Sequence, residues 1–222
     1  MNPQPVYFLS GLGADERAFQ ALRLPDVSMH HVRWLKPQPR ERIEQYALRL
    51  LEQIPTPKPI LVGLSFGGML SVEIAKQVPV QKIIQISSAR THHAIPKFYK
   101  AGRYFPIYRW VPIKSYLRYS PLAYKRVGAR LPQDIATLKQ VFMEADEDFY
   151  KWAIHQIVHW RNEVVLPNLV QIHGTRDQLL PDFSTAKYVV EDGTHYMVRD
   201  RAAEISAILM KEIGINPSHP TA

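Results

Sequence analysis

The chain has 222 residues, of which 46% are hydrophobic and 22% are charged, and it contains no cysteine. The length is sufficient for one well-buried core, and the lack of cysteine excludes thiol catalysis, disulfides and thiolate metal sites. No apolar stretch approaches the roughly 18 residues of a membrane span, and the first residues lack the pattern of a signal peptide. We therefore expect a cytoplasmic protein, whose net charge of +8 matters only if it is concentrated in one place.

The first part of the chain alternates between short apolar runs and helical patterns. Residues 6–9 predict a buried strand, and Asp15 can cap a helix over residues 16–22. Residues 27–34 indicate a second strand, which we place at an edge of the sheet because polar residues interrupt it. Apolar residues then recur at helical spacing over 43–54, until a proline-rich segment ends that helix.

The same alternation continues to the end of the chain, with one long interruption. Strands are predicted at 60–64 and 82–86, and the last two at 169–173 and 187–190. A final amphipathic helix ends just before Gly214. This order predicts an α/β fold with a mostly parallel sheet of about six strands and helices on both faces. Functional sites in such sheets lie beyond the carboxyl ends of the strands.

The sequence Gly-Leu-Ser-Phe-Gly around Ser65 lies between a predicted strand and a predicted helix. Such a strand–turn–helix places a serine hydroxyl on a sharp bend, and the flanking glycines at 63 and 67 avoid crowding the facing strand and helix. A bare G-x-S-x-G occurs by chance in roughly one chain of this length in ten or twenty, so the flanking elements carry much of the weight.

Two further polar segments follow predicted strands. Asp177 comes shortly after the strand at 169–173, and His195 comes a few residues after the strand at 187–190. A serine hydroxyl needs a base to remove its proton, and an imidazole near its natural pKa suits that role. A carboxylate can hold the imidazole in the required tautomer. Asp182 and Asp192 lie near Asp177 in the chain and are alternatives for the acid.

These segments resemble the α/β-hydrolase family, in which a serine, an acid and a histidine follow one another in this order. The resemblance implies that Ser65 is the nucleophile, Asp177 the orienting acid and His195 the general base. It also implies an oxyanion hole formed by the backbone N–H groups of Leu12, in the loop after the first strand, and of Phe66.

The chain departs from the family pattern at three places. Ser10 stands where the family often has a histidine before Gly11, so another group must brace the oxyanion loop. The family's opening pair of strands is missing, because the first predicted strand starts almost at the first residue. The interval between Asp177 and His195 is too short for a full helix, and a loop must replace it.

The middle of the chain, residues 91–163, lacks the strand pattern and is predicted to be a helical cap inserted into the α/β-hydrolase core. The core is then formed by residues 1–90 and 164–216, and residues 217–222 are expected to be a flexible tail. The middle segment holds 14 of the 23 Phe, Trp and Tyr residues, and 12 Lys and Arg against 6 Asp and Glu. Within it, residues 91–130 contain nine basic residues and no acidic one.

Three interpretations of this basic, aromatic stretch remain open. It could be a lid that walls an acyl site and attracts anionic substrates. It could contact an anionic membrane surface, with Tyr and Trp at headgroup depth. Nucleic-acid binding is the third and is not expected, because no recognised reading module is present.

The sequence as a whole predicts a serine hydrolase that cleaves a carboxylic ester or thioester in a small-molecule acyl substrate. No cofactor and no metal are expected, because His155 and His159, one helical turn apart, lack a carboxylate that would complete a metal site, and His92 with His93 are read as ordinary residues. A hydrolase-like binding protein or receptor with little turnover remains an alternative, and so does a cofactor-free lyase or C–C hydrolase with the same triad.

Overall fold

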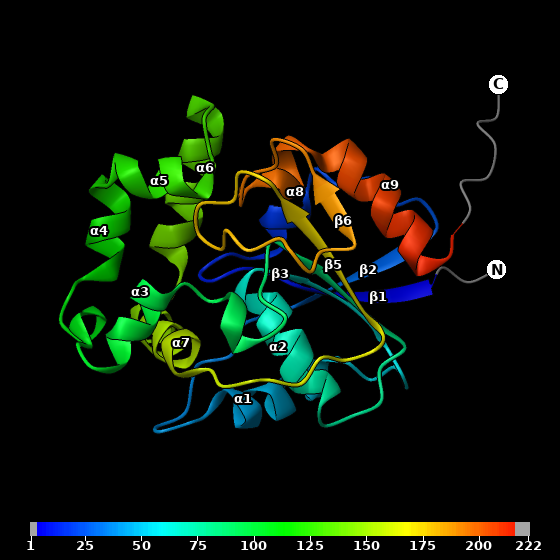
Figure 1. The fold of residues 1–222 in the computed structure, drawn as a ribbon, viewed down its shortest axis with the longest axis horizontal. Coiled ribbons are helices and arrows are strands. Elements are labelled where there is room, and N and C mark those ends of the chain that lie inside the picture. The colour runs from blue at the N-terminus through cyan, green and yellow to red at the C-terminus, as the bar shows by residue number, and fades with distance from the viewer. Residues whose placement is uncertain (1–3, 216–222) are drawn as a thin grey trace.

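The computed structural model describes residues 4–215 of the chain. Its centre is a sheet of six strands that all run parallel to their neighbours (Figure 1). The α/β class and the number of strands are therefore as predicted from the sequence. The strands are β1 Gln4–Leu9, β2 Val27–Val32, β3 Ile60–Leu64, β4 Lys82–Ile86, β5 Leu169–Gly174 and β6 Tyr188–Val190.

The strand order across the sheet is β2-β1-β3-β4-β5-β6. The polar β2 lies at one edge, as its composition predicted, whereas β3 and β4 lie in the middle and are almost fully buried. The chain changes direction across the sheet between β2 and β3, because β3 pairs with β1 on the side opposite β2. All carboxyl ends of the strands lie at one edge of the sheet, where the predicted site residues follow β3, β5 and β6.

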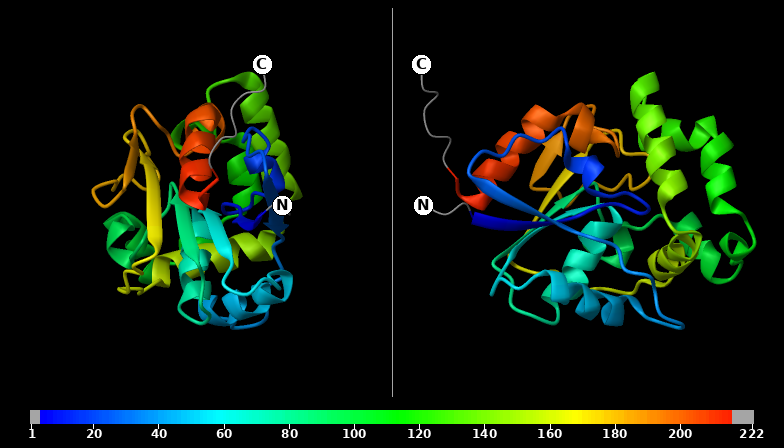
Figure 2. Two further views of the ribbon diagram at one scale, coloured as in Figure 1. Left: turned by 90° about the vertical axis from the view of Figure 1, so that its right-hand side faces the viewer. Right: turned by 180° about the vertical axis from the view of Figure 1, so that it is seen from behind.

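The core is divided between the two faces of the sheet, because successive residues of a strand point to opposite sides. On β1, Tyr7 and Leu9 pack with helices α1 and α2, whereas Val6 and Phe8 pack with α9 on the other face. Figures 1 and 2 show α1 and α2 covering one face and α8 and α9 covering the other. These helices are α1 Ile43–Leu50, α2 Phe66–Ala75, α8 Met197–Asp200 and α9 Ala202–Ile213.

Two of the predicted helices are shorter than expected. The helix predicted over 16–22 is only the 3-10 turn Glu16–Phe19, although Asp15 does cap it by accepting from the Arg17 N–H. α1 ends at Leu50, and a 3-10 turn completes the predicted segment. The end of α9 is as predicted, because Gly214 follows it with a φ of 87°, a conformation that glycine adopts without strain.

Every element between β4 and β5 is helical. Figure 1 shows these helices beside the sheet, at the end where the strands β5 and β6 point. The division into a cap at 91–163 and a core at 1–90 and 164–216 stays a prediction. The predicted flexible tail at 217–222 lies outside the described residues. The helices are α3 Lys97–Lys100, α4 Ile113–Tyr119, α5 Pro121–Val127, α6 Pro132–Glu144 and α7 Glu147–His159.

Helix α7 joins this segment to the rest of the molecule. The Trp152 Nε1–H donates to the carbonyl of Glu41 at 2.8 Å, and the Trp160 indole after the helix donates to the buried carboxylate of Glu73 at 2.7 Å. Phe149 and Ala153 are buried on the same side of α7. The apolar side of this helix therefore packs onto α1 and α2. Within residues 4–215, no helix is both long and apolar enough to cross a membrane.

The buried carboxylate of Glu212 connects α9 to the sheet. It accepts hydrogen bonds from Lys82 Nζ at 2.9 Å, Lys187 Nζ at 2.7 Å and the Tyr188 hydroxyl at 2.7 Å. Burial raises the pKa of Glu212, but the hydrogen bonds from Lys187, Tyr188 and Lys82 outweigh this and lower the pKa to about 2. The ionised carboxylate therefore stabilises the fold.

We expect Glu212→Gln to lower the free energy of unfolding by about 2 kcal/mol at pH 7, because it removes a charge that holds two lysines. The folded pKa lies below the unfolded value, so the contribution is complete above roughly pH 4.5 and decreases as the pH falls toward 2. Urea unfolding of both proteins between pH 3 and pH 7 should show a difference that narrows at low pH. Glu204→Gln, at an exposed position of the same helix, is the control, and an equal loss in both variants would contradict the prediction.

Candidate active site

Ser65 lies at the sharp turn between β3 and α2 in a strained backbone conformation. Its φ of 51° and ψ of −117° are adopted by a non-glycine residue only when the surroundings enforce them. The Ser65 N–H donates to the carbonyl of Ile86 at 2.9 Å, and the Ser65 carbonyl accepts from Ser88 Oγ at 2.6 Å. These two bonds hold the turn against the end of β4.

The glycines on either side of Ser65 allow the backbone to pack closely. A Cβ atom on Gly67 would lie 2.2 Å from the carbonyl oxygen of Leu9, at the end of β1. A Cβ atom on Gly63 would lie 2.4 Å from the Cα of Gly68. The motif therefore needs glycine at both positions, which is the crowding predicted from the sequence.

Asp177 and His195 are brought together by the loops that follow β5 and β6. The Arg176 N–H donates to the carbonyl of Gly193 at 2.9 Å. A Cβ atom on Gly174 would lie 2.1 Å from the same carbonyl oxygen, so the two loops pack backbone against backbone. This close approach places the carboxylate of Asp177 beside the imidazole of His195.

The side chains of Ser65, His195 and Asp177 form one hydrogen-bonded chain. His195 Nε2 lies 2.9 Å from Ser65 Oγ, and His195 Nδ1 lies 2.8 Å from Asp177 Oδ2. Since an ionised carboxylate can only accept, the proton of the neutral imidazole belongs on Nδ1. Nε2 is then free to accept the proton of the Ser65 hydroxyl, which is the arrangement that base-assisted attack requires.

The ionised form of Asp177 is stabilised by its surroundings. Its Oδ1 atom accepts from the N–H groups of Leu179 and Leu180, both at 2.9 Å. Burial raises the pKa of Asp177, but the electrostatic interaction with His195 and the hydrogen bonds around the carboxylate outweigh this and hold the pKa well below its usual range. Asp177 is therefore a carboxylate at neutral pH.

His173 is a member of this cluster that the sequence analysis did not identify. Its buried side chain donates from Nε2 to the carbonyl of Leu180 at 2.7 Å, and the same atom lies 3.3 Å from Asp177 Oδ2. It thus supports both the carboxylate and the loop that follows it. The available sequence signal was a histidine on a buried strand, four residues before the acid.

The two alternative acids have other partners. Asp182 accepts from the N–H and the hydroxyl of Ser184, and Asp192 forms a salt bridge with Arg176 at 2.6 Å. Within the described part of the chain, neither carboxylate has a hydrogen bond to His195. The geometry therefore favours Asp177.

The loop after β1 lies directly against Ser65. A Cβ atom on Gly11 would be 3.5 Å from Ser65 Cβ. Ser10 braces this loop, because its hydroxyl donates to the carbonyl of Ala14 at 2.7 Å, and the Trp34 indole donates to the same carbonyl at 2.8 Å. Ser10 thus supplies a support that the sequence alone did not reveal.

The backbone N–H groups of Leu12 and Phe66 are available at this site. Phe66 is the first residue of α2, and the first N–H groups of a helix have no partner within it. Leu12 lies in the turn closed by the bond from the Ala14 N–H to the Gly11 carbonyl at 3.0 Å. Within residues 4–215 we find no intramolecular hydrogen bond from either N–H. The oxyanion hole expected from the sequence therefore stays a prediction, with both N–H groups unpaired among the described residues.

A buried network of glutamine side chains supports the Ser65 turn. Gln85 and Gln171 are neighbours in the register of β4 and β5. The Gln171 amide donates to the carbonyl of Ser88 at 2.7 Å, and Ser88 Oγ in turn donates to the carbonyl of Ser65. The Gln85 amide donates to the carbonyl of Gly68 at 2.9 Å. The amide N–H groups of both glutamines are paired and hold the loops, whereas the buried Gln85 Oε1 has no hydrogen-bond partner among the described residues.

The helical segment contacts two loops of this site. A Cβ atom on Gly13 would lie 2.1 Å from the Tyr150 hydroxyl of α7, and one on Gly128, just after α5, would lie 2.2 Å from Thr194 Oγ1. A cavity of about 740 Å³ lies beside the second contact. It is lined by Tyr119, Pro121, Tyr124, Lys125, Gly128, Ala129, Arg130, Ile135, Arg176, Gln178 and Thr194.

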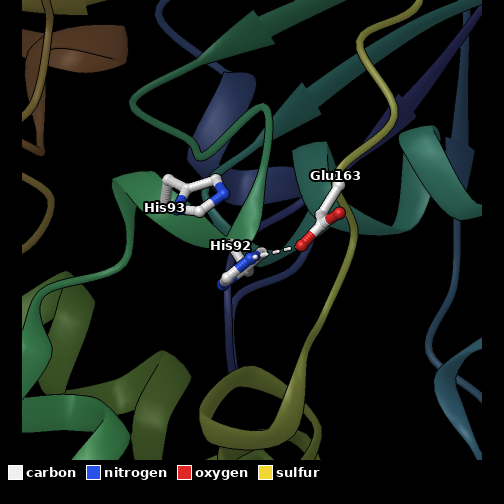
Figure 3. Close-up of side chains that lie close together, drawn as sticks. All are labelled: His92, His93 and Glu163. Atoms are coloured by element: carbon white, nitrogen blue, oxygen red, sulfur yellow. Dashed lines mark hydrogen bonds and ion pairs between the residues drawn. The ribbon is translucent and has the colours of Figure 1, made fainter.

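One group of side chains offers ligands for a metal ion. His92, His93 and Glu163 each place a ligand atom within 4.8 Å of the others, where the chain enters and leaves the helical segment (Figure 3). His92 Nε2 lies 3.4 Å from Glu163 Oε1, a long and weak contact, and 76% of the Glu163 side chain is exposed. The rings of His155 and His159 are in contact at a tilt of 35°, and their hydrogen-bond partners are the Tyr108 hydroxyl and the His155 carbonyl.

The parallel sheet and the hydrogen-bonded serine, histidine and aspartate at its carboxyl edge define the α/β class of hydrolases. A model of this family, described as "Alpha/beta hydrolase family", matches residues 6–208. The chain therefore belongs to the α/β-hydrolase family. No curated protein sequence matches the chain significantly.

Solved structures of other proteins have the same fold. An esterase from Thermogutta terrifontis is 15% identical with a TM-score of 0.67, covering 95% of this chain and 89% of its own. An enol-lactonase from Burkholderia xenovorans is 16% identical with a TM-score of 0.67, covering 96% and 92%. A bromoperoxidase from Bacillus anthracis is 14% identical with a TM-score of 0.71, covering 95% and 92%. At these identities the likeness demonstrates the fold.

We expect Gly67→Ala to destabilise the protein by about 3 kcal/mol, because the added methyl group would collide with the carbonyl of Leu9. Thermal unfolding should show the lower stability. Gly102→Ala is the matched control, since a Cβ atom there would be 3.4 Å from Val158 Cγ1, which is normal contact. A Gly67→Ala variant as stable as this control would contradict the close packing at the turn.

Proposed function

We propose that the protein is a serine hydrolase that cleaves a carboxylic ester or thioester through an acyl-enzyme on Ser65. The observation that carries this proposal is the position of His195, which has Ser65 on one ring nitrogen and the ionised Asp177 on the other. A histidine held in this way is a general base for the serine hydroxyl. Family membership supports the same chemistry.

In the proposed reaction, Ser65 Oγ attacks the substrate carbonyl while His195 Nε2 takes its proton. The tetrahedral oxyanion is held by the N–H groups of Leu12 and Phe66, each worth roughly 3 kcal/mol. His195 then gives the proton to the leaving alcohol or thiol, and an acyl group remains on Ser65. Water, activated by the same imidazole, releases the acid and restores the hydroxyl. Asp177 remains a carboxylate throughout and orients His195.

We propose that the helices between residues 91 and 163 form a cap and that the large cavity receives part of the substrate. Its lining residues Gln178 and Thr194 are chain neighbours of Asp177 and His195. A volume of about 740 Å³ is within the range of small-molecule sites. Tyr124 and Ile135 offer apolar surface there, and Lys125 offers a positive charge. This supports a small acyl substrate.

A fluorophosphonate probe tests the proposal directly, because it reacts with an activated serine. We expect it to label the wild type and to leave Ser65→Ala unlabelled, with labelling of His195→Ala slowed by several orders of magnitude. Mass spectrometry of the labelled peptide locates the site. If a folded wild type is not labelled, the protein belongs instead with hydrolase-like binding proteins.

Substitution of the acid distinguishes Asp177 from its neighbours in sequence. We expect Asp177→Asn to lower kcat roughly 10⁴-fold on a reactive ester, because the amide favours the wrong tautomer of His195. Asp182→Asn and Asp192→Asn should retain nearly full activity, since their partners are Ser184 and Arg176. The measurement is steady-state kinetics on p-nitrophenyl esters of graded acyl length. A large loss with Asp182→Asn or Asp192→Asn would assign the acid elsewhere.

A further inference from the structure

The segment before and within α4 exposes an unusual amount of apolar surface. Tyr104 is 80% exposed, Trp110 75% and Phe105 72%, although large apolar side chains are normally exposed only singly. We call the surface of residues 97–126 the basic aromatic face. Its exposed large apolar residues are Phe98, Tyr104, Phe105, Ile107, Trp110, Tyr116, Tyr119 and Leu122.

The same segment is anchored to the protein by other residues. Ile95, Ile113 and Tyr124 are buried, and Ile113 and Tyr124 pack with residues of α6 and α7. Helices α4 and α5 thus have one side in the core, and their other side is apolar where solvated helices are usually polar. The turns at 97–112 have no fully buried residue, and they are held by Tyr99, which packs against the core, and by the bonds of Arg103. Exposure of these rings is therefore a feature of a packed structure, which calls for a partner outside the chain.

The described cations of this face are not paired with acids of the protein. Of the lysines and arginines between 97 and 130 whose side chains are described, none forms a salt bridge. Arg103 donates to the carbonyls of Val158 and Trp160, and Lys114 to that of Met143, so these two have structural roles. The exposed cations of the face are Lys97, Arg109, Lys125 and Arg126, of which Lys125 also lines the large cavity.

Figures 1 and 2 both place α4 and the turns before it at the outer end of the helical layer, on the side away from the sheet. The exposed rings of Tyr104, Phe105 and Trp110 are absent from the lining of the large cavity. Tyr119 and Lys125, at the α5 end of the face, do line it. Among the interpretations of this segment, an outward contact therefore fits better than a wall around the substrate.

We propose that the basic aromatic face docks the protein on an anionic membrane surface. Lysine and arginine near such a surface contribute roughly 1 kcal/mol each, and tryptophan and tyrosine place their rings at headgroup depth. Phe98, Phe105 and Ile107 have no polar group, so they gain by entering the boundary of the acyl chains. A nucleic acid would satisfy the cations but would leave these side chains in water. Anionic lipids of the cytoplasmic leaflet match the expected location of the protein.

Sedimentation with lipid vesicles tests this proposal. We expect the wild type to bind vesicles of phosphatidylglycerol and phosphatidylcholine, and to bind pure phosphatidylcholine at least tenfold less. The double variant Lys97→Glu and Arg109→Glu should bind the anionic vesicles roughly 30-fold more weakly, and added salt should weaken the wild type in the same direction. The double variant Phe105→Ser and Trp110→Ser should also bind more weakly but retain the dependence on salt.

A second pair of charge reversals provides the matched control. Arg33→Glu and Lys139→Glu change the net charge equally at exposed positions outside the face, and this variant should bind like the wild type. Thermal unfolding confirms that each variant is folded, and Ser65→Ala should bind vesicles unchanged, which separates docking from the proposed hydrolysis. Equal weakening in both charge-reversal pairs would overturn the proposal. So would a wild type that binds an RNA oligonucleotide but no anionic vesicle.

Discussion

The backbone of Ser65 is the constraint on which the rest of the site depends. A residue with a φ of 51° persists only if its surroundings hold it. Here it is held by hydrogen bonds to the Ile86 carbonyl and from the Ser88 hydroxyl, and by close backbone packing at the flanking glycines. Gly67 lets α2 begin against the carbonyls at the end of β1, and this same contact brings Gly11 against Ser65. The turn that presents the hydroxyl thus also places the loop of Leu12 beside it. The Ser65 turn and the position of the Leu12 loop therefore both require glycine at 67 and close packing at Gly11.

The rest of the site is held by buried polar side chains, and burying a polar side chain costs desolvation free energy. A hydrophobic residue at Gln171 would pack in the sheet without desolvating an amide, but the carbonyl of Ser88 would then be left unpaired. His173 has the same role for the loop of Leu180. Gln171 and His173 are satisfied and add rigidity at little net cost, although Gln85 Oε1 in the same network has no hydrogen-bond partner among the described residues. The sheet therefore gives up part of its apolar packing to fix the loops at its carboxyl edge.

Features that depend on local sequence patterns could be predicted from the sequence. Features that depend on side-chain contacts between residues far apart in the chain could not. The strands, the edge position of β2 and the meeting of Ser65, Asp177 and His195 follow from periodicity, turn residues and the shared edge of a parallel sheet. The support of Asp177 by His173 and the bracing of the oxyanion loop by Ser10 depend on side-chain contacts that leave no periodic signal. The helix predicted over 16–22 is only one 3-10 turn in the structure, because tertiary packing can override the helix propensity of a short segment.

The basic residues of the protein fall into two groups, those that stabilise the fold through ion pairs and those that do not. In the sheet and its helices, basic residues pair with buried acids, as Lys82 and Lys187 do with Glu212. Residues 91–130 contain no acid, and among the cations there whose side chains are described, Arg103 and Lys114 donate to backbone carbonyls. Stability therefore does not explain why so many cations gather there, since unpaired like charges repel. Their density next to exposed aromatic rings is explained if selection acts on a contact outside the chain. On that argument the helical layer has two functional surfaces. One contacts the site loops at Gly13 and Thr194, and the other is the outward basic aromatic face.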